Sequence, residues 1–218
     1  CYTLGAYKPI EAIDTCICMG ASVGVANGIS KLHDDLVIAL VGDSTFYHTG
    51  VPGLINAVYN QNNILTIILD NGTTAMTGAQ PHPGTGIKIT GDKGVKVTLE
   101  DLLIGIGIKK ENLWVIDSND LNSMMDALSQ AYKKKNEPRV IVSRRLCSLL
   151  DRASIKTRKR VEVNRDKCKD CMICIKSYGC PALTVKGGEV VIVETKCNRC
   201  GFCIEICPFN AIERKEEE

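Results

Sequence analysis

The feature that most constrains this chain is a cysteine motif that occurs twice near its C-terminal end. The copies read CKDCMICIKSYGCPAL, from residue 168, and CNRCGFCIEICPFNAI, from residue 197. Each copy spaces three cysteines two residues apart and follows the fourth with proline, which ends the loop because its ring fixes φ and removes a backbone donor. Three thiolates on one short loop can hold three corners of an iron–sulfur cubane, and the fourth corner can come from the other copy.

The motif therefore predicts two 4Fe–4S clusters that each draw on both copies. The second copy is similar to the run found in bacterial two-cluster ferredoxins, and the first has two extra residues before its fourth cysteine. We predict that one cluster is bound by Cys168, Cys171, Cys174 and Cys207, and the other by Cys180, Cys197, Cys200 and Cys203. Structural zinc is the main alternative, but zinc sites pair two ligands on each hook with a longer spacer. Disulfides are less expected, since the rest of the chain reads as a cytosolic domain.

Apolar and amphipathic segments alternate in the first 150 residues. Short apolar runs predict strands over residues 36–42, 64–71, 113–117 and 139–144. Helical periodicity predicts helices over residues 20–32, 51–61, 98–107 and 119–135, with Thr98 as an N-cap and His33 as a cation at a helix C-terminus. Strands that alternate with helices predict an α/β fold with a mostly parallel sheet.

The composition changes along the chain and predicts its division into domains. The hydrophobic content of 44% supports a packed core, and the net charge of +2 gives no overall attraction to nucleic acid or membrane. We predict an α/β domain over residues 1–150, a basic linker over 151–160 and a small α+β domain over 161–218. The basic run could also dock an acidic partner. The chain begins at Cys1 rather than Met, and we expect it to be a piece of a longer polypeptide.

A carboxylate stands at the end of the first predicted strand. Asp43 directly follows Gly42, and the next predicted strand ends at Asn71. The carboxyl ends of parallel strands form the ligand-binding crevice of such sheets. The side chains of Asp43 and Asn71 could therefore hold Mg²⁺ beside a phosphate. The N-terminus of the helix that starts near Val51 could face the phosphate oxygens. Asp43 could equally cap a helix, and Asn71 could serve a turn. The long Gly/Thr/Pro stretch over 71–94 favours a ligand, since such loops are usually functional.

The chain as a whole resembles the 2-oxoacid:ferredoxin oxidoreductase family. Gly42-Asp43-Ser44 followed by Asn71 matches the thiamine-diphosphate motif of that family. The segments CMGASVGVANGISK, GDSTFYHTGVPGLINAVYN, DNGTTAMTGAQPHPGTG and CMICIKSYGCPAL are similar to the large (α) subunit of its indolepyruvate-type members. The resemblance covers essentially the whole chain. It implies a thiamine-diphosphate-binding domain of the pyrophosphate type, followed by a two-cluster ferredoxin-like domain.

The resemblance also implies roles for individual residues. Mg²⁺ would be bound by Asp43, Asn71 and the backbone carbonyl of Thr73. The other implied cofactor-binding residues are Gly42 and Ser44 at the diphosphate, Gly20, Ala21 and Ser22 near the thiazolium, and Met76, Thr77, Gly78 and Gln80 in a loop that closes over the cofactor. His48 and His82 flank this pocket and are candidate catalytic residues that could contact substrate or cofactor.

The implied activity is oxidative decarboxylation of an aryl-2-oxoacid, with thiamine diphosphate, Mg²⁺ and two 4Fe–4S clusters as cofactors and coenzyme A as co-substrate. Electrons would pass through both clusters to an external ferredoxin. The implied partners are a smaller β subunit and the remaining N-terminal domains, which would supply the Glu that activates the cofactor, and the implied location is the cytoplasm. Two other functions stay open: an electron carrier whose α/β domain only docks partners, and a zinc-stapled binding module.

Overall fold

The computed structural model describes residues 1–32 and 34–215, so the predicted role of His33 lies outside the described residues. The chain divides into two compact units. One comprises Ile17–Cys147, and the other comprises Ser148–Glu218 together with Cys1–Cys16. The first 16 residues group with the cysteine-rich unit, and the domain ranges 1–150 and 161–218 stay predictions.

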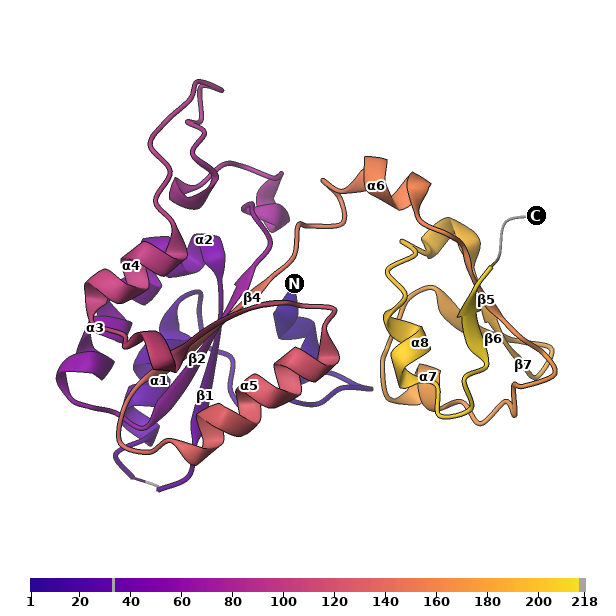
Figure 1. Ribbon diagram of the computed structural model, residues 1–218, viewed down its shortest axis with the longest axis horizontal. Coiled ribbons are helices and arrows are strands. Elements are labelled where there is room, and N and C mark those ends of the chain that lie inside the picture. The colour runs from indigo at the N-terminus through magenta and orange to yellow at the C-terminus, as the bar shows by residue number, and fades with distance from the viewer. Residues whose placement is uncertain (33, 216–218) are drawn as a thin grey trace. The chain divides into compact units, whose positions relative to one another are not determined.

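The larger unit is built on a four-stranded sheet in the order β1-β2-β4-β3, and all of its pairings are parallel (Figure 1). Its strands are β1 (Val37–Gly42), β2 (Ile64–Asp70), β3 (Leu113–Asp117) and β4 (Arg139–Arg144). Its longer helices are α1 (Ala21–Ile29), α3 (Val51–Tyr59), α4 (Leu99–Ile106) and α5 (Leu121–Lys133). The predicted α/β fold is therefore confirmed, and the Thr98 hydroxyl accepts from the Asp101 N–H as expected of an N-cap.

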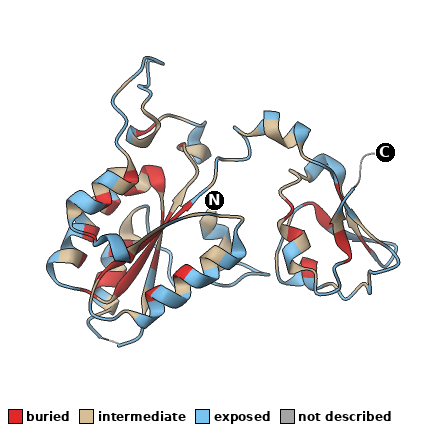
Figure 2. Cartoon of the chain, in the orientation of Figure 1, coloured by how far each residue is buried: buried red, intermediate tan, exposed pale blue. Residues whose placement is uncertain are grey.

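The sheet is covered by helices on both faces, as the positions of the buried residues indicate (Figure 2). Ile64 and Ile68 of β2 belong to a core that α1, α3 and α4 share, while Leu65 and Ile67 belong to a second core with α5. Successive residues of a strand point to opposite faces. Because both faces of β2 are buried, its sequence is apolar from Ile64 to Leu69 except at the buried Thr66, as is usual for parallel strands.

The helical segment after β1 begins eight residues earlier than predicted. A turn of helix α2 (Asp43–Thr45) continues through a π-helical turn (Phe46–Gly50) into α3, so residues 43–50 extend the helix predicted over residues 51–61. Pro52 has no N–H to donate to the fourth residue before it, His48, and its ring crowds that carbonyl. The wider π turn accommodates the proline at this point. The N-terminus of the helical segment therefore lies at Asp43 rather than near Val51.

The smaller unit has the α+β content predicted for it. Strand β5 (Val161–Val163) pairs antiparallel with β8 (Ile212–Arg214), and β6 (Leu183–Lys186) forms a hairpin with β7 (Glu189–Ile192). The short helices α7 (Ile173–Lys176) and α8 (Phe202–Ile206) follow the two cysteine loops. Four strand residues and two cysteines form its core: Val161, Leu183, Val190, Ile212, Cys174 and Cys203.

The stretch predicted as a basic linker is part of the folded unit. It forms helix α6 (Arg152–Thr157), and the Arg158 guanidinium donates to the Asp151 carboxylate and to the carbonyl of Asn198. Arg199 in turn donates to the carbonyl of Arg158 (3.0 Å). These bonds explain why residues from Ser148 onward group with the cysteine-rich unit. Across the described residues, no helix is long and apolar enough to cross a membrane.

Candidate cofactor and cluster sites

The carboxylate of Asp43 joins the carboxyl ends of β1 and β2. Gly42 is paired with Leu69, so the two strands end at the same level of the sheet. Oδ2 of Asp43 accepts from the backbone N–H of Gly72 (2.8 Å), and Oδ1 accepts from that of Ser44 (2.7 Å). The side chain of Asp43 is only 2% exposed. The predicted strand-end position is therefore found, and the carboxylate binds the turn after β2 as well as its own helix.

His82 makes a further contact with this carboxylate. Its Nε2 lies 3.1 Å from Asp43 Oδ2, and its Nδ1 accepts from the Gly84 N–H (3.1 Å). Since a nitrogen that accepts carries no proton, Nε2 carries it and donates to Asp43. His82 is 7% exposed, and its two ring nitrogens are engaged by Asp43 and Gly84, so neither nitrogen is left to contact a substrate. The other candidate, His48, is exposed in the π turn.

Hydrogen bonds keep the buried Asp43 ionised. Burial alone would raise its pKa, but the bonds from His82 and from the Ser44 N–H outweigh burial and hold the pKa below its usual value. A carboxylate offers about four lone-pair positions. The Gly72 and His82 donors occupy Oδ2 and the Ser44 donor occupies one position on Oδ1, so among the described donors a position on Oδ1 stays available to a cation.

The residues after β2 form a closed turn beside Asp43. The Asn71 Oδ1 accepts from the Thr73 N–H (3.0 Å), which leaves this oxygen a second lone pair. The Thr73 hydroxyl donates to the carbonyl of Gln80 (3.2 Å), and Thr74 is bridged to Gln80. Ser44 is tied to the same turn by a hydroxyl contact of 2.7 Å with Thr74. Asp43, Ser44, Asn71 and Thr73 are thus brought together, whereas Met76 and Thr77 at the tip of the loop are exposed.

The start of α1 lies against the same helical segment. Gly20 has φ +83°, and a Cβ there would meet the side chains of Thr49 at 1.8 Å and Thr45 at 3.6 Å, so only glycine fits. The Ser22 hydroxyl is buried and has no hydrogen-bond partner among the described residues. An unsatisfied buried hydroxyl is rare and calls for a ligand or water. The open Ser22 hydroxyl and the unused carboxylate and amide oxygens described above have the donor chemistry that a cofactor would need, whereas the requirement for glycine at position 20 comes from packing against Thr49.

A cleft of about 500 Å³ opens beside this site at the ends of β2 and β4. Its lining includes Tyr47, His82 and Arg144. Arg144 bridges Asp70 (2.6 Å) and Glu100 (2.7 Å), which ties β4, β2 and the start of α4 together. Burial and the charge of Asp70 raise the pKa of Tyr47 to about 12, so its hydroxyl stays protonated and donates to the carbonyl of Val97 (2.6 Å). The sequence did not single out Tyr47.

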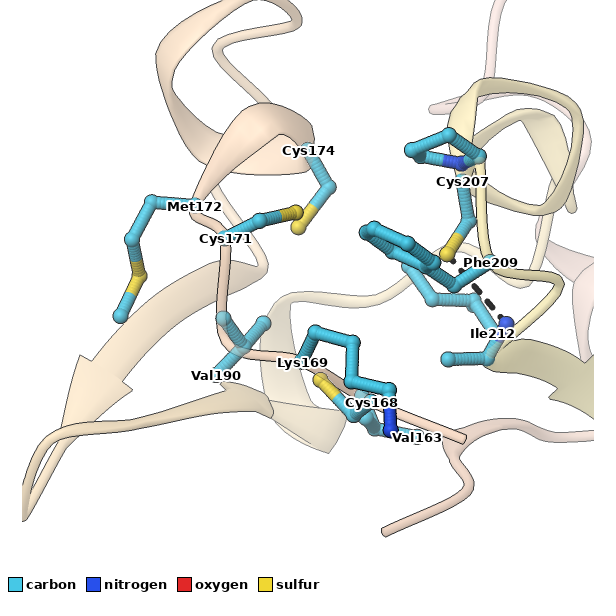
Figure 3. Close-up of a pocket in the computed structure, with 12 residues that line it drawn as sticks. Val163, Cys168, Lys169, Cys171, Met172, Cys174, Val190, Cys207, Phe209 and Ile212 are labelled. Carbon is cyan, nitrogen blue, oxygen red and sulfur yellow. Dashed lines mark hydrogen bonds between the residues drawn. The ribbon is translucent and has the colours of Figure 1, made fainter. Parts of the chain in front are cut away.

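The four cysteines predicted for the first cluster line one pocket in the smaller unit. Cys168, Cys171 and Cys174 come from the first copy, and Cys207 comes from the second. Figure 3 shows their sulfurs turned toward the same space, with the apolar side chains of Val190, Phe209 and Ile212 around them. The backbone N–H of Ala211 donates to the Cys207 sulfur (3.3 Å), the kind of bond that tunes a cluster's potential.

The other four cysteines are also near one another. Burial, and then the charges of Cys200, Cys180 and Cys197, raise the pKa of Cys203 to about 12. In the first group, burial and the charges of Cys171, Cys207 and Cys168 raise the pKa of Cys174. The charges that raise the pKa of Cys203 thus come from the three cysteines predicted to share its cluster, and the same holds for Cys174. Cysteines bind iron as thiolates, and the positive charge of the iron would offset the repulsion between these thiolates.

The two cysteine loops share one backbone conformation. Asp170 and Met172 in the first copy have φ of 45° and 63°, and the equivalent Arg199 and Gly201 have φ of 53° and 84°. The left-handed region is unusual for residues other than glycine, so the agreement indicates a common purpose. Among the described residues, no three His, Cys, Asp or Glu side chains are spaced to hold a single metal ion. The thiols of a cubane each bind a different iron and lie farther apart than those of a zinc site.

Of two matching family models, one covers mainly the larger unit and the other covers part of the smaller unit. Residues 1–143 match the thiamine pyrophosphate enzyme, C-terminal TPP binding domain, and residues 190–213 match the 4Fe-4S binding domain. Indolepyruvate oxidoreductase subunit IorA of Archaeoglobus fulgidus is 44% identical over 98% of this chain, and that of Thermococcus kodakarensis is 37% identical over 100% of it. These matches cover 34% and 36% of the two relatives, so the chain spans about a third of their length.

A short relative matches a smaller part of the chain. A ferredoxin of Methanothermococcus thermolithotrophicus is 34% identical over 59 residues, which are 26% of this chain and 98% of the ferredoxin. The structure and the family matches lead to the same assignment. The chain belongs to the thiamine pyrophosphate enzymes, whose C-terminal TPP-binding domain it carries ahead of a 4Fe–4S binding domain.

Proposed function

We propose that this chain is part of a 2-oxoacid:ferredoxin oxidoreductase of the indolepyruvate type. The enzyme would decarboxylate an aryl-2-oxoacid oxidatively, release the acyl group on coenzyme A and pass the electrons through two 4Fe–4S clusters to ferredoxin. Relatives named indolepyruvate oxidoreductase subunit IorA match along nearly the whole chain. The substrate class, coenzyme A and the ferredoxin acceptor rest on this similarity and on the residues that the chain shares with the family.

In this proposal the ends of β1 and β2 hold the cofactor. Asp43, Asn71 and the carbonyl of Thr73 would bind Mg²⁺, with Gly42 and Ser44 beside the diphosphate. When bound, thiamine diphosphate supplies the nucleophilic carbon that makes decarboxylation of a 2-oxoacid possible. The chain contributes an ionised, buried carboxylate with an unfilled position on Oδ1 and the second lone pair of the Asn71 side-chain oxygen.

The observation that carries the proposal is the bond between Asp43 and Gly72. It fixes a carboxylate with a free lone-pair position at the meeting point of two parallel strands, inside a domain of the TPP-binding family. A domain that only docked an electron carrier would not need this carboxylate to keep an unfilled lone-pair position on Oδ1. This argument favours the enzyme over the electron-carrier alternative.

Further parts of the enzyme would come from outside this chain. We place the Glu that activates the cofactor in the remaining N-terminal domains, and we expect a smaller β subunit to complete the assembly. The chain's share of about a third of the relatives' length is compatible with such additional domains. We expect the enzyme in the cytoplasm, because a reducing compartment keeps cysteine thiols available as cluster ligands.

An anaerobic assay of the full-length, partner-containing complex tests the proposed reaction. Ferredoxin reduction would be followed in parallel with indolepyruvate, phenylpyruvate, pyruvate and 2-oxoglutarate, each with coenzyme A. We expect the two aryl substrates to give the highest kcat/KM. Turnover of pyruvate or 2-oxoglutarate alone would overturn the aryl assignment, and no reduction by any oxoacid would overturn the activity.

Binding measurements separate the enzyme from the electron-carrier alternative. In the same complex, Asp43→Asn should abolish Mg²⁺-dependent binding of thiamine diphosphate measured by calorimetry. Asp117→Asn is the matched control, because Asp117 is also a carboxylate at the end of a strand of this sheet but is paired with Arg145 at the surface. Equal affinities in both variants and the wild type would remove the metal site from Asp43.

A further inference from the structure

The role of His82 follows from what surrounds its ring. Its Nε2–H donates to the same oxygen of Asp43 that accepts from Gly72, and its Nδ1 is held by the N–H of Gly84. With both nitrogens engaged and the ring buried, His82 has no free group to offer a substrate. Its bond adds a second donor to Oδ2 of Asp43, whereas Oδ1 accepts, among the described residues, only from the Ser44 N–H and keeps an unfilled lone pair.

The ring of His82 is itself clamped. Tyr47 stacks on it with the ring centroids 5.4 Å apart and the planes at 29°. The Tyr47 hydroxyl donates to the carbonyl of Val97, which anchors the far end of the loop. A Cβ on Gly84 would lie 2.8 Å from Tyr47 and 2.9 Å from His82, so a side chain at this position would displace the clamp.

These contacts connect the helical segment after β1 to two places in the loop that follows β2. Asp43 begins the helical segment after β1, Gly72 begins the turn after β2, and His82 lies in the middle of the long loop. A carboxylate can rotate about its last bond, and only donors on both oxygens hold it in one orientation. The Gly72 N–H is also shared with Asp70 (3.2 Å), so it restrains Asp43 less than an exclusive donor would.

We propose that His82 is a positioning residue for the Mg²⁺ site: its Nε2–H holds Asp43 Oδ2 so that Oδ1 is presented to the cation of the bound diphosphate. The inference rests on the proposed function for the presence of that cation. It replaces the expectation that His82 contacts the substrate. Partners of this kind around a metal ligand typically contribute about 10- to 100-fold to metal affinity.

Two amide substitutions separate the two hydrogen bonds of His82. The amide of His82→Gln reaches the position of Nε2 and can still donate to Asp43, but it no longer accepts from Gly84. The amide of His82→Asn reaches only the position of Nδ1, so it can accept from Gly84 and cannot reach Asp43. The apparent Mg²⁺ affinity of each variant would be measured by calorimetry in the full-length complex saturated with thiamine diphosphate.

We expect His82→Asn to weaken Mg²⁺ binding about 10-fold or more, and His82→Gln to change it by less than about 3-fold. Equal affinity in both variants and the wild type would overturn the proposal. Equal weakening in both would also overturn it, because the ring would then act through packing. If the wild type binds neither Mg²⁺ nor thiamine diphosphate, the proposed function fails instead.

A cofactor-free measurement tests the hydrogen bond by itself. Amide hydrogen exchange over residues 71–86 would be compared in the metal-free complex. We expect faster exchange in His82→Asn than in His82→Gln, because the bond to Asp43 closes the loop onto the helix. The reverse order would contradict the proposed contact, whatever the enzyme's reaction proves to be.

Discussion

Single residues at the sheet edge show two ways in which charge is tolerated at the ends of parallel strands. Asp43 is buried and ionised because every donor around it is fixed by the backbone or by a clamped ring. Arg144 is treated differently: it is partly exposed and is shared between the carboxylates of Asp70 and Glu100. The first arrangement leaves a position for a cation, whereas the second satisfies its own charges and connects elements of the sheet.

The Glu100–Arg144 pair makes the stability of the larger unit depend on pH. The bond from Arg144 lowers the pKa of Glu100 even though burial opposes the shift. A group whose pKa is lower in the folded state stabilises the fold above its unfolded pKa and loses this contribution as the pH falls through its folded pKa. We therefore expect Glu100→Gln to be less stable than the wild type at pH 7, and the difference to disappear as the pH falls through the lowered pKa of Glu100.

The difference at pH 7 should not exceed about 1 kcal/mol, since both partners are more than a third exposed and solvent screens them. Urea unfolding followed by the fluorescence of the single tryptophan, Trp114 in β3, reports on this unit. A difference between the proteins that stays constant from pH 7 to pH 3 would contradict the assignment.

At the scale of elements, β4 and α5 are joined by a buried guanidinium. Arg139 is fully buried, and its hydrogen bonds go to carbonyl and amide oxygens rather than to a carboxylate. It donates to the carbonyls of Ala131 and Lys134 at the end of α5, to that of Ile64 and to Asn63. Since helix C-termini carry unpaired carbonyls and partial negative charge, the arginine satisfies them.

Arg139→Met should destabilise the larger unit by about 2–4 kcal/mol, because it leaves these carbonyls buried without donors. Arg139→Lys keeps the charge but has fewer N–H donors, so its stability should lie between that of the wild type and that of Arg139→Met. The measurement is the midpoint of urea unfolding at Trp114, which donates to Gln130 of α5 and so reports on this packing. A smaller loss of stability in Arg139→Met than in Arg139→Lys would contradict this role of Arg139.

Periodicity was sufficient to predict most elements of the larger unit, since each strand and helix buries a regular set of side chains. It failed where a local exception decided the outcome, as at the helical segment that begins at Asp43 and widens before Pro52. The contact between His82 and Asp43 spans 39 residues and depends on the course of a loop, which no local pattern specifies. Composition likewise suggested a linker at 151–160, because basic residues that bond to a neighbouring loop look the same in sequence as solvated ones.

At the scale of the whole molecule, the two units carry two different kinds of site. The larger presents a strand-end carboxylate, and the smaller gathers cysteines from both copies of its motif. We predict that the clusters are shared between the copies. Cys207→Ala and Cys171→Ala, alone or together, should then cost the same single cluster, or about four iron atoms. Cys207→Ala combined with Cys200→Ala should cost both.

Iron and sulfide analysis of anaerobic preparations measures this pattern. Iron losses that add up for Cys207 and Cys171, or that coincide for Cys207 and Cys200, would show that each copy binds its own cluster. Stoichiometric zinc without iron would support the zinc-stapled alternative and remove the redox function.

The measurement that tests the central claim most directly is reduction of the clusters by a 2-oxoacid without any external acceptor. The full-length complex, loaded with Mg²⁺ and thiamine diphosphate, would be mixed anaerobically with indolepyruvate and coenzyme A, and the visible absorption and electron paramagnetic resonance of the clusters would be followed. We predict that the clusters are reduced in the wild type and in Asp117→Asn but stay oxidised in Asp43→Asn. Clusters that stay oxidised in a wild type with bound thiamine diphosphate, or that are reduced equally in Asp43→Asn, would contradict the account.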